Sequence, residues 1–180
     1  SSPPVIDGLA GVEKTVSLTA VGDIMLARGI AAYIRKHGVE YPSSLVADIT
    51  SSSDITFANL ESPIGTKGSP LPGKMIWFRA DPSSVECLTR ASVDVVTLAN
   101  NHTLDYDSEN LLETIEILDA SGIAHTGAGR NITEARRPAV IERNGIRVAF
   151  LGYNEFANPS RYWSTKYPRT LLATDSLPGT

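Results

Sequence analysis

The chain has 180 residues, of which 42% are hydrophobic and 20% charged, a balance that excludes a disordered or fibrous polymer and fits one globular domain. Its lysines and arginines are scattered and its formal net charge is −4, so it lacks the basic face that binding to a nucleic-acid backbone requires. The single cysteine, Cys87, cannot form a disulfide within the chain and is expected to be a buried helix residue.

The amino-terminal half is predicted to alternate strands and helices after an irregular start. Residues 1–14 are rich in proline, glycine and serine and show no periodicity, which predicts a linker or arm before a domain over 15–180. Period-two alternation indicates the strands, and Asp81-Pro82 is a typical helix start. In chain order we expect a strand over 16–20, a helix over 45–49, a strand over 55–58, a loop over 62–73, a strand over 75–78 and a helix over 81–91.

The second half continues this alternation, which is typical of the α/β fold class. The expected order is a strand over 93–98, a helix over 108–121, a short strand over 123–126, a capped helix start at Asn131, and a hairpin of 139–142 with 146–153 around Asn144-Gly145. Beyond Phe156 no periodic pattern predicts a further element.

Polar side chains follow four of the predicted strands at the point where each strand ends. They are Asp23, Asn59 with Glu61, Asn101 with His102, and Asn154 with Glu155. Ligands of α/β sheets bind outside the carboxyl ends of the strands, so we expect these side chains to line one pocket. Carboxylate, amide and imidazole donors without thiolate suit Mn, Fe, Zn or Mg. Two such ions can activate a water against a phosphoryl group, and an imidazole can exchange a proton near neutral pH.

Each of these residues also has a structural interpretation. Asp23 could cap the turn after its strand, Asn101-His102 could form a satisfied turn, and Glu61 could simply be solvated, but their grouping favours a site. Asn59 and Asp105 are left open between metal binding and shaping of the turn. The remaining residues are expected to have structural roles: Asn154 and Glu155 in the pocket wall, His37 and His125 at the surface or in packing, and the glycines of 127–129 in a turn.

Three runs of the sequence resemble one bacterial family. The runs are AVGDIMLAR from residue 20, NLESP from residue 59 and LANNHTLDY from residue 98. In this order and spacing they are similar to the CapA family of poly-gamma-glutamate capsule-biosynthesis proteins, within the calcineurin-like metallophosphoesterase superfamily. The resemblance covers most of residues 16–155. It implies two packed mixed β-sheets flanked by helices (αββα), of which this chain is an incomplete amino-terminal portion.

The resemblance also implies roles for individual residues. The implied metal ligands are Asp23, Glu61 as the bridging carboxylate and Asn101, while His102 is the implied catalytic residue. Asp105 matches the family's Asn-Asn-His-x-x-Asp pattern. Arg28 matches a basic residue that contacts an anionic substrate group, and Asn154 joins it as a candidate for substrate binding.

Three departures from the family pattern change these expectations. Met25 stands where a typical metallophosphoesterase has a histidine ligand, so one metal site is expected to be weak or absent. Further histidine motifs do not follow before Thr180, so we expect the rest of the site outside this chain and no dinuclear centre on it alone. Asp107 replaces a usual glycine, which puts the turn after Tyr106 in question.

Two functions of different classes follow from these residues. One is a metal-dependent hydrolase of an anionic, phosphoester-type substrate in capsule biosynthesis, with His102 essential. The alternative is a non-catalytic module that binds or hands on poly-gamma-glutamate, together with other capsule-synthesis proteins, on a degenerate phosphoesterase fold. A plain α/β domain with coincidental polar strand ends is the third interpretation. We expect an extracytoplasmic protein, with a membrane anchor in its full-length form.

Overall fold

The computed structural model describes residues 13–154 together with residues 169 and 170. Three predicted features lie outside the described residues. These are the linker up to residue 12, Glu155 and most of the segment that follows Phe156.

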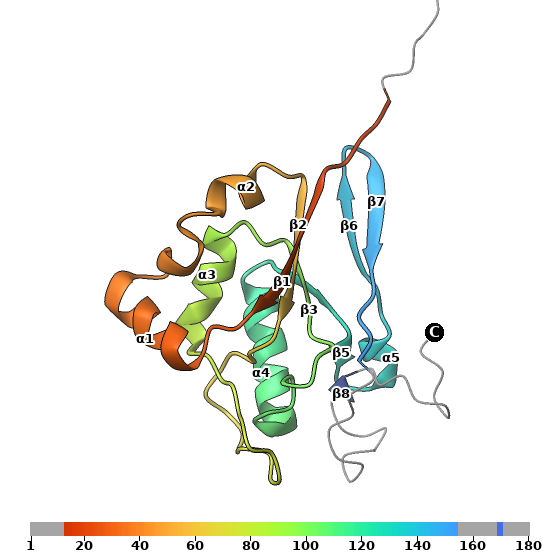
Figure 1. The fold of residues 1–180 in the computed structure, drawn as a ribbon. Helices are drawn as coiled ribbons and strands as arrows, with labels where there is room; N and C mark the ends of the chain where they lie inside the picture. The colour runs from red at the N-terminus through yellow and green to blue at the C-terminus, as the bar shows by residue number, and fades with distance from the viewer. Residues whose placement is uncertain (1–12, 155–168, 171–180) are drawn as a thin grey trace, which may run out of the picture.

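A four-stranded parallel sheet in the order β1-β2-β3-β4 runs through the middle of the described domain (Figure 1). Its strands are β1 (Leu18–Ile24), β2 (Ile55–Leu60), β3 (Val95–Thr97) and β4 (Ala124–Thr126). Because every neighbouring pair is parallel, the carboxyl ends of all four strands lie at one edge of the sheet. The predicted α/β class is confirmed.

Helices connect these strands. They are α1 (Arg28–His37), the short 3₁₀ turn η1 (Tyr41–Ser43) and α2 (Ala47–Ser51), then η2 (Pro82–Ser84) with α3 (Val85–Arg90), and α4 (Asp107–Ala120). One face of the sheet packs on α3 and α4, where Ala58, Leu60 and Val96 join one buried cluster with Leu88 and Leu111. The helix start predicted at Asp81-Pro82 is present as the cap of η2, which leads into α3, since the Asp81 side chain accepts from Ser83 N at 2.9 Å.

The opposite face of the sheet is covered by an antiparallel hairpin of β6 (Ala139–Arg143) and β7 (Ile146–Phe150) (Figure 1). Ile55 and Val95 point to this side, and the rings of Phe57 and Phe150 stack with centroids 5.5 Å apart. The turn has φ of 54° at Asn144 and 72° at Gly145, as a two-residue hairpin loop with left-handed residues requires. The predicted hairpin is therefore confirmed, although β7 ends at Phe150 rather than at residue 153.

A small substructure follows β4. It consists of β5 (Ala128–Gly129), α5 (Ile132–Ala135) and β8 (Arg169–Thr170), which pairs antiparallel with β5. The predicted cap of α5 is present, because the Asn131 side chain accepts from Glu134 N at 3.0 Å. The Glu134 carboxylate accepts from Arg130 N at 2.9 Å. In a standard capping box it would instead accept from the backbone N–H of the cap residue, Asn131.

Some local expectations are wrong. Residues 75–78 form no strand, because Trp77 Nε1 donates to Leu71 O and Phe78 N donates to the Asp105 carboxylate instead of to a neighbouring strand. The helix expected over 45–49 lies two residues later, as α2, and β1 continues through Asp23 to Ile24. Helix α1 was not predicted: it begins at Arg28 with a φ of 53°, and its Ala27 cap makes no side-chain hydrogen bond.

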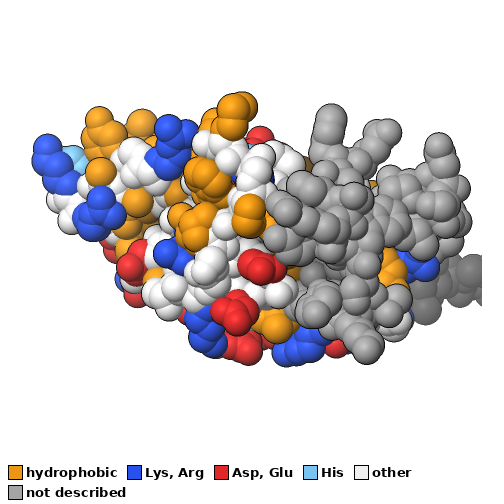
Figure 2. All heavy atoms as spheres, turned by 90° about the horizontal axis from the view of Figure 1, so that it is seen from below, with side chains coloured by type: hydrophobic (Ala, Val, Ile, Leu, Met, Phe, Trp, Pro, Cys, Tyr) orange, Lys and Arg blue, Asp and Glu red, His pale blue; other side chains and the backbone are white. Residues whose placement is uncertain are grey.

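Several large apolar side chains around α1, η1 and α2 are exposed. On this side of the molecule hydrophobic side chains gather with lysines and arginines among them, as the left part of Figure 2 shows. Leu45 is 95% exposed and Ile49 is 63% exposed. Ile34 is the one buried residue of α1, while its other large apolar residues Ile30 and Tyr33 are 36% and 50% exposed. No helix within the described residues is both long and apolar enough to cross a bilayer.

Cys87 is buried on α3, as predicted. It lies in the wall of an apolar cavity of about 250 Å³ between β1 and the α2 and α3 helices. Burial raises the pKa of the Cys87 thiol to about 11, so the thiolate that would react is scarce at neutral pH.

The loop after β2 is held by a carboxylate of α4. Thr66 N and Lys67 N each donate to Glu113 at 2.7 Å, and the Thr66 hydroxyl donates at 3.0 Å. Burial raises the pKa of Glu113, but these hydrogen bonds together outweigh it and leave the pKa below its usual value.

This lowered pKa predicts an acid-sensitive contribution to stability. A group with a lower pKa in the folded state stabilises the fold above its unfolded pKa, about 4.3 for glutamate, and the contribution is lost as pH falls through the folded value. We therefore expect Glu113→Gln to make the free energy of unfolding fall less steeply below about pH 4.3. Urea unfolding between neutral and acidic pH measures this, and an unchanged slope would contradict it. Glu116→Gln, an exposed neighbour on α4, is the control.

Candidate functional site

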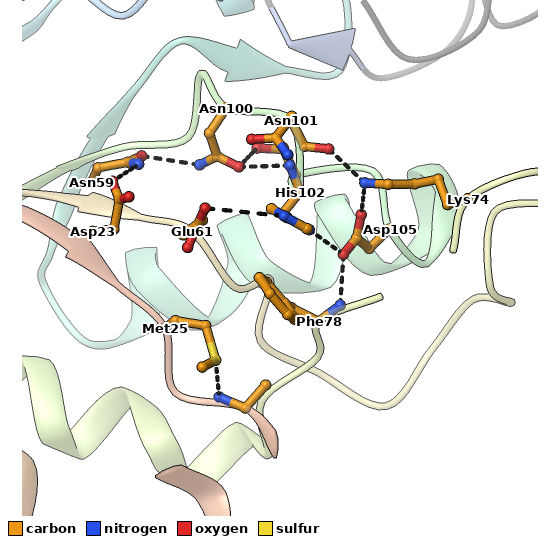
Figure 3. Close-up of polar contacts among 12 residues, drawn as sticks. Asp23, Met25, Asn59, Glu61, Lys74, Phe78, Asn100, Asn101, His102 and Asp105 are labelled. Carbon is orange, nitrogen blue, oxygen red and sulfur yellow. Dashed lines mark hydrogen bonds and ion pairs between the residues drawn. The ribbon is translucent and has the colours of Figure 1, made fainter. Parts of the chain in front are cut away.

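The polar residues predicted at the ends of the first three strands, Asp23, Asn59, Glu61, Asn101 and His102, do meet at the carboxyl edge of the sheet (Figure 3). Asp23 on β1 lies opposite Asn59 on β2 in the strand register, and Asn59 Nδ2 donates to Asp23 Oδ1 at 2.7 Å. Asn100, after β3, donates from Nδ2 to Asn59 Oδ1 at 3.0 Å and to Leu60 O at 2.9 Å. One chain of hydrogen bonds therefore links the ends of three neighbouring strands.

Asn100 shapes the turn that presents His102. Its Oδ1 accepts from His102 N at 3.0 Å and from the Thr103 hydroxyl at 3.1 Å. Asn100 is 7% exposed, so its amide is fully used inside the fold. Sequence reasoning named Asn101 and passed over Asn100, although the Asn-Asn-His run contained the signal. Asn101 itself is exposed beside His102, and its backbone carbonyl accepts from Lys74 Nζ at 2.7 Å.

His102 is held in one orientation by a buried carboxylate. Its Nδ1 lies 2.7 Å from Asp105 Oδ2, and Asp105 is completely buried. Because a carboxylate only accepts, Nδ1 is assigned as the protonated nitrogen. The Phe78 ring stacks on the imidazole with centroids 4.0 Å apart, which fixes the plane of the ring.

The other imidazole nitrogen faces the strand-end carboxylates. His102 Nε2 lies 4.0 Å from Glu61 Oε1, and Figure 3 shows Glu61 between His102 and the Asp23 end of the site. Glu61 is partly exposed and Asp23 is exposed. The site therefore has a buried side, formed by Asp105 and by His102, which is 8% exposed, and an accessible side formed by Asp23 and Glu61.

Arg28 lies beside Phe78 in a strained backbone conformation. Its φ of 53° is uncommon for a residue with a side chain and costs about 1–2 kcal/mol. Its guanidinium carbon lies 6.0 Å from the centre of the Phe78 ring, whose other contact is the His102 imidazole. The strained residue therefore places its cationic side chain next to the ring that stacks on His102.

Met25 fills the position at which a histidine ligand was expected. Its sulfur accepts from Ala27 N at 3.3 Å, so the side chain turns toward its own backbone (Figure 3). The Ser62 hydroxyl, buried next to Glu61, accepts from Leu26 N at 2.9 Å and joins this turn to the end of β2.

The turn after Tyr106 is formed in spite of the unusual residue at 107. Asp107 has a φ of 68°, in the left-handed region that glycine prefers and that aspartate tolerates better than most residues. Its side chain accepts from Ser108 N at 2.6 Å and begins α4. Asp107 therefore adopts the backbone conformation that a glycine would allow, and the turn after Tyr106 is formed.

The other candidate residues lie apart from His102 or at its border. Asn154 is 8% exposed. Two residues before it, Gly152 packs so closely on the end of β3 that an added Cβ would lie 2.4 Å from Thr97 Oγ1. The segment before Asn154 therefore passes the carboxyl end of β3. His37 stacks on two tyrosines of the α1 surface and His125 pairs with Asp119 at 3.3 Å, so their expected packing roles are confirmed.

The described donors do not by themselves complete a metal centre. Within residues 13–154 and 169–170, no three His, Cys, Asp or Glu side chains lie close enough together to hold an ion. Asp105 occupies His102 Nδ1, one Asp23 oxygen accepts from Asn59, and Met25 supplies no oxygen or nitrogen. Asp23 and Glu61 are the carboxylates that remain on the accessible side. Any ion there needs donors beyond these residues, so no chemical step is assigned to it.

Comparison with known proteins matches this chain to one family. The family described as "Bacterial capsule synthesis protein PGA_cap" matches residues 17–177. The capsule biosynthesis protein CapA of Bacillus anthracis is 29% identical over 145 residues, which are 79% of this chain and 35% of that protein.

Two further relatives have related names. The PGA biosynthesis protein CapA of Bacillus subtilis is 26% identical over 145 residues, which are 79% of this chain and 38% of that protein. A probable polyglutamine synthesis accessory protein of Mycobacterium tuberculosis is 35% identical over 101 residues, 56% of this chain and 27% of the relative. The chain thus spans little more than a third of the two CapA relatives. The match across residues 17–177 places the chain in the bacterial capsule synthesis family PGA_cap, as its resemblance to CapA proteins led us to expect.

Proposed function

We propose that this chain carries the proton-transfer side of a hydrolytic site in a poly-gamma-glutamate capsule-biosynthesis protein, acting on an anionic, phosphoester-type substrate. One observation supports it above the others. A fully buried carboxylate, Asp105, orients the His102 imidazole and leaves Nε2 facing the partly exposed Glu61, whose Oε1 lies 4.0 Å away. This is the arrangement that a general acid or base requires.

Arg28 is the cationic group that suits an anionic substrate, whereas the carboxylate of Glu61 faces Nε2. Arg28 supplies a guanidinium on the Phe78 side, which can pair with a carboxylate or phosphoryl oxygen. His102 Nε2 would donate a proton to a leaving oxygen or accept one from water, while Asp105 steadies the imidazole through Nδ1. Asp23 and Glu61 are the residues that would contact a Mn, Fe, Zn or Mg ion, with further ligands from outside the described residues; such an ion would supply Lewis acidity.

A non-catalytic, polymer-handling module is the second candidate. It is favoured by Met25, whose thioether turns toward Ala27 N where a ligand was expected, and by the incomplete donor set around Asp23 and Glu61. In this case Arg28 would bind the anionic polymer, and His102 would support the turn alone. The two candidates therefore differ in what His102 does.

Replacement of His102 separates these candidates. In the complete protein, with an activated phosphodiester and added Mn²⁺, we expect His102→Ala to lower kcat/KM about 10²–10⁴-fold, the usual contribution of a general acid or base. His125→Ala, whose imidazole pairs with Asp119 of α4 rather than with a strand-end residue, is the matched control and should keep full activity. Turnover unaffected by His102→Ala would contradict a catalytic role for this residue. No turnover by the wild type, with retained binding of poly-gamma-glutamate, would support the module.

A further inference from the structure

We propose that Lys74 is the positioning residue of this site, because its ammonium joins the two ends of the turn that carries His102. One contact is with the backbone carbonyl of Asn101, the residue before His102, at 2.7 Å. The other is an ion pair with the Asp105 carboxylate that holds the imidazole. No sequence motif singled out Lys74, which lies 31 residues before Asp105.

The charge of Lys74 compensates a carboxylate that water cannot reach. Asp105 has no exposed side-chain surface, while the Lys74 side chain is 17% exposed. A buried carboxylate is costly unless it is paired and hydrogen-bonded, and Asp105 accepts from Lys74, from Phe78 N and from His102. Without Lys74 the carboxylate would keep two neutral donors, so it would be free to turn toward solvent and release the imidazole.

The loop that carries Lys74 is itself held against the turn. Leu71 N donates to Asp105 O at 2.8 Å, and Trp77 Nε1 donates to Leu71 O at 2.9 Å. Arg79 donates to the carbonyls of Thr66 and Lys67, and its guanidinium carbon lies 3.9 Å from the centre of the Tyr106 ring. Lys74 therefore acts from a fixed support.

The immediate surroundings of Lys74 show that its inward direction is not forced by packing. Its neighbours Met75 and Ile76 are 92% and 48% exposed, as expected for a loop tip in solvent. A lysine at such a tip gains hydration and side-chain freedom by pointing outward. Its inward position is accounted for by the two oxygen atoms that it contacts on either side of His102.

The first test measures the geometry of the imidazole and does not depend on turnover. In ¹⁵N NMR of the complete protein at one fixed pH, the wild-type His102 ring should give the signals of a single tautomer with the proton on Nδ1. Lys74→Met keeps the apolar stem and removes the charge, and it should shift or broaden these signals. Lys74→Arg should restore most of the wild-type pattern. Lys67→Met removes an exposed lysine of the same loop, paired with Glu116 at 3.8 Å, and should change nothing at His102.

The second test uses catalysis and rests on the proposed function. Lys74→Met should lower kcat about 10–100-fold with KM within twofold, because a misplaced catalytic group affects the chemical step more than binding. Lys74→Arg should recover most of kcat. If the wild type has no turnover, the proposed function fails while the NMR result still decides the positioning role.

Two outcomes would overturn the inference. One is an unchanged His102 spectrum in folded Lys74→Met. The other is loss of folding in both Lys74→Met and Lys74→Gln, a neutral variant that keeps two N–H donors. Circular dichroism would show this loss, and Lys74 would then be needed for stability rather than for positioning His102. If only Lys74→Met fails to fold, Lys74→Gln takes its place in both tests, and the same shift of the His102 signals is expected.

Discussion

Replacing Asp105 with alanine is expected to lower the free energy of unfolding by about 3–5 kcal/mol, the cost of removing one partner from a buried ion pair. The Asp105 carboxylate is fully buried and accepts from Lys74, Phe78 N and His102. Its removal leaves the Lys74 ammonium and a backbone N–H without this acceptor in a site that excludes water. Urea or guanidinium unfolding, followed by circular dichroism, measures the change.

Two further variants separate the charge of Asp105 from its shape. Asp105→Asn keeps the volume and one acceptor oxygen, so we expect a smaller loss than with alanine but a disturbed His102, since an amide cannot serve all three donors. Asp107→Asn is the control in the same loop, where asparagine also suits the φ of 68° and can accept from Ser108 N; it should lie within about 0.5 kcal/mol of the wild type. A loss below about 1 kcal/mol for Asp105→Ala would show that water reaches this position.

The sheet could be predicted from the sequence because both of its faces are covered, one by the helices and the other by the β6–β7 hairpin. On β2, Ile55 and Phe57 face the hairpin while Ala58 and Leu60 lie in the cluster with the helices, so both faces of the strand carry apolar side chains. The polar side chains begin where this burial ends. The position of the site at the carboxyl edge follows from that change and from the parallel direction of the strands.

The supports of the site could not be predicted in this way. Lys74 and Phe78 lie in the loop that was mistaken in part for a strand, and they contact Asp105 across 31 and 27 residues of sequence. Short apolar runs such as residues 75–78 have the same pattern in a strand and in a loop that is packed on its neighbours. Only the fold of the loop decides which groups meet, so no local spacing indicates these contacts.

The start of α1 shows the same limit for backbone conformation. Helix α1 begins at Arg28 with a left-handed φ of 53°, and Ala27 before it supplies no capping side chain. The Leu26 N–H bound to the Ser62 hydroxyl and the Arg28 side chain near Phe78 fix this turn from outside the helix. Tertiary contacts thus determine a local conformation that intrinsic propensity disfavours.

Gly68→Ala is expected to lower the free energy of unfolding by about 2–4 kcal/mol, through both backbone strain and overpacking. Gly68 has a φ of 78°, and a Cβ at this position would lie 1.9 Å from the backbone oxygen of Tyr106 and 3.3 Å from Asn110 N. These are backbone atoms at the start of α4, so they cannot move aside as a flexible side chain would. Chemical unfolding of the wild type and the variant gives the difference.

Gly122→Ala is the matched control for Gly68→Ala because it introduces the same kind of backbone strain, from a positive φ, without a close contact of the new Cβ. Gly122 has a φ of 70° after the end of α4, and a Cβ there would meet no atom within 4 Å. Alanine at this position should therefore cost only about 1 kcal/mol. The excess cost at Gly68 measures how firmly the loop is packed on Tyr106, one residue after Asp105. Equal costs at both glycines would mean that the loop can move away from α4, and Lys74 would then lack the fixed support from which it positions His102.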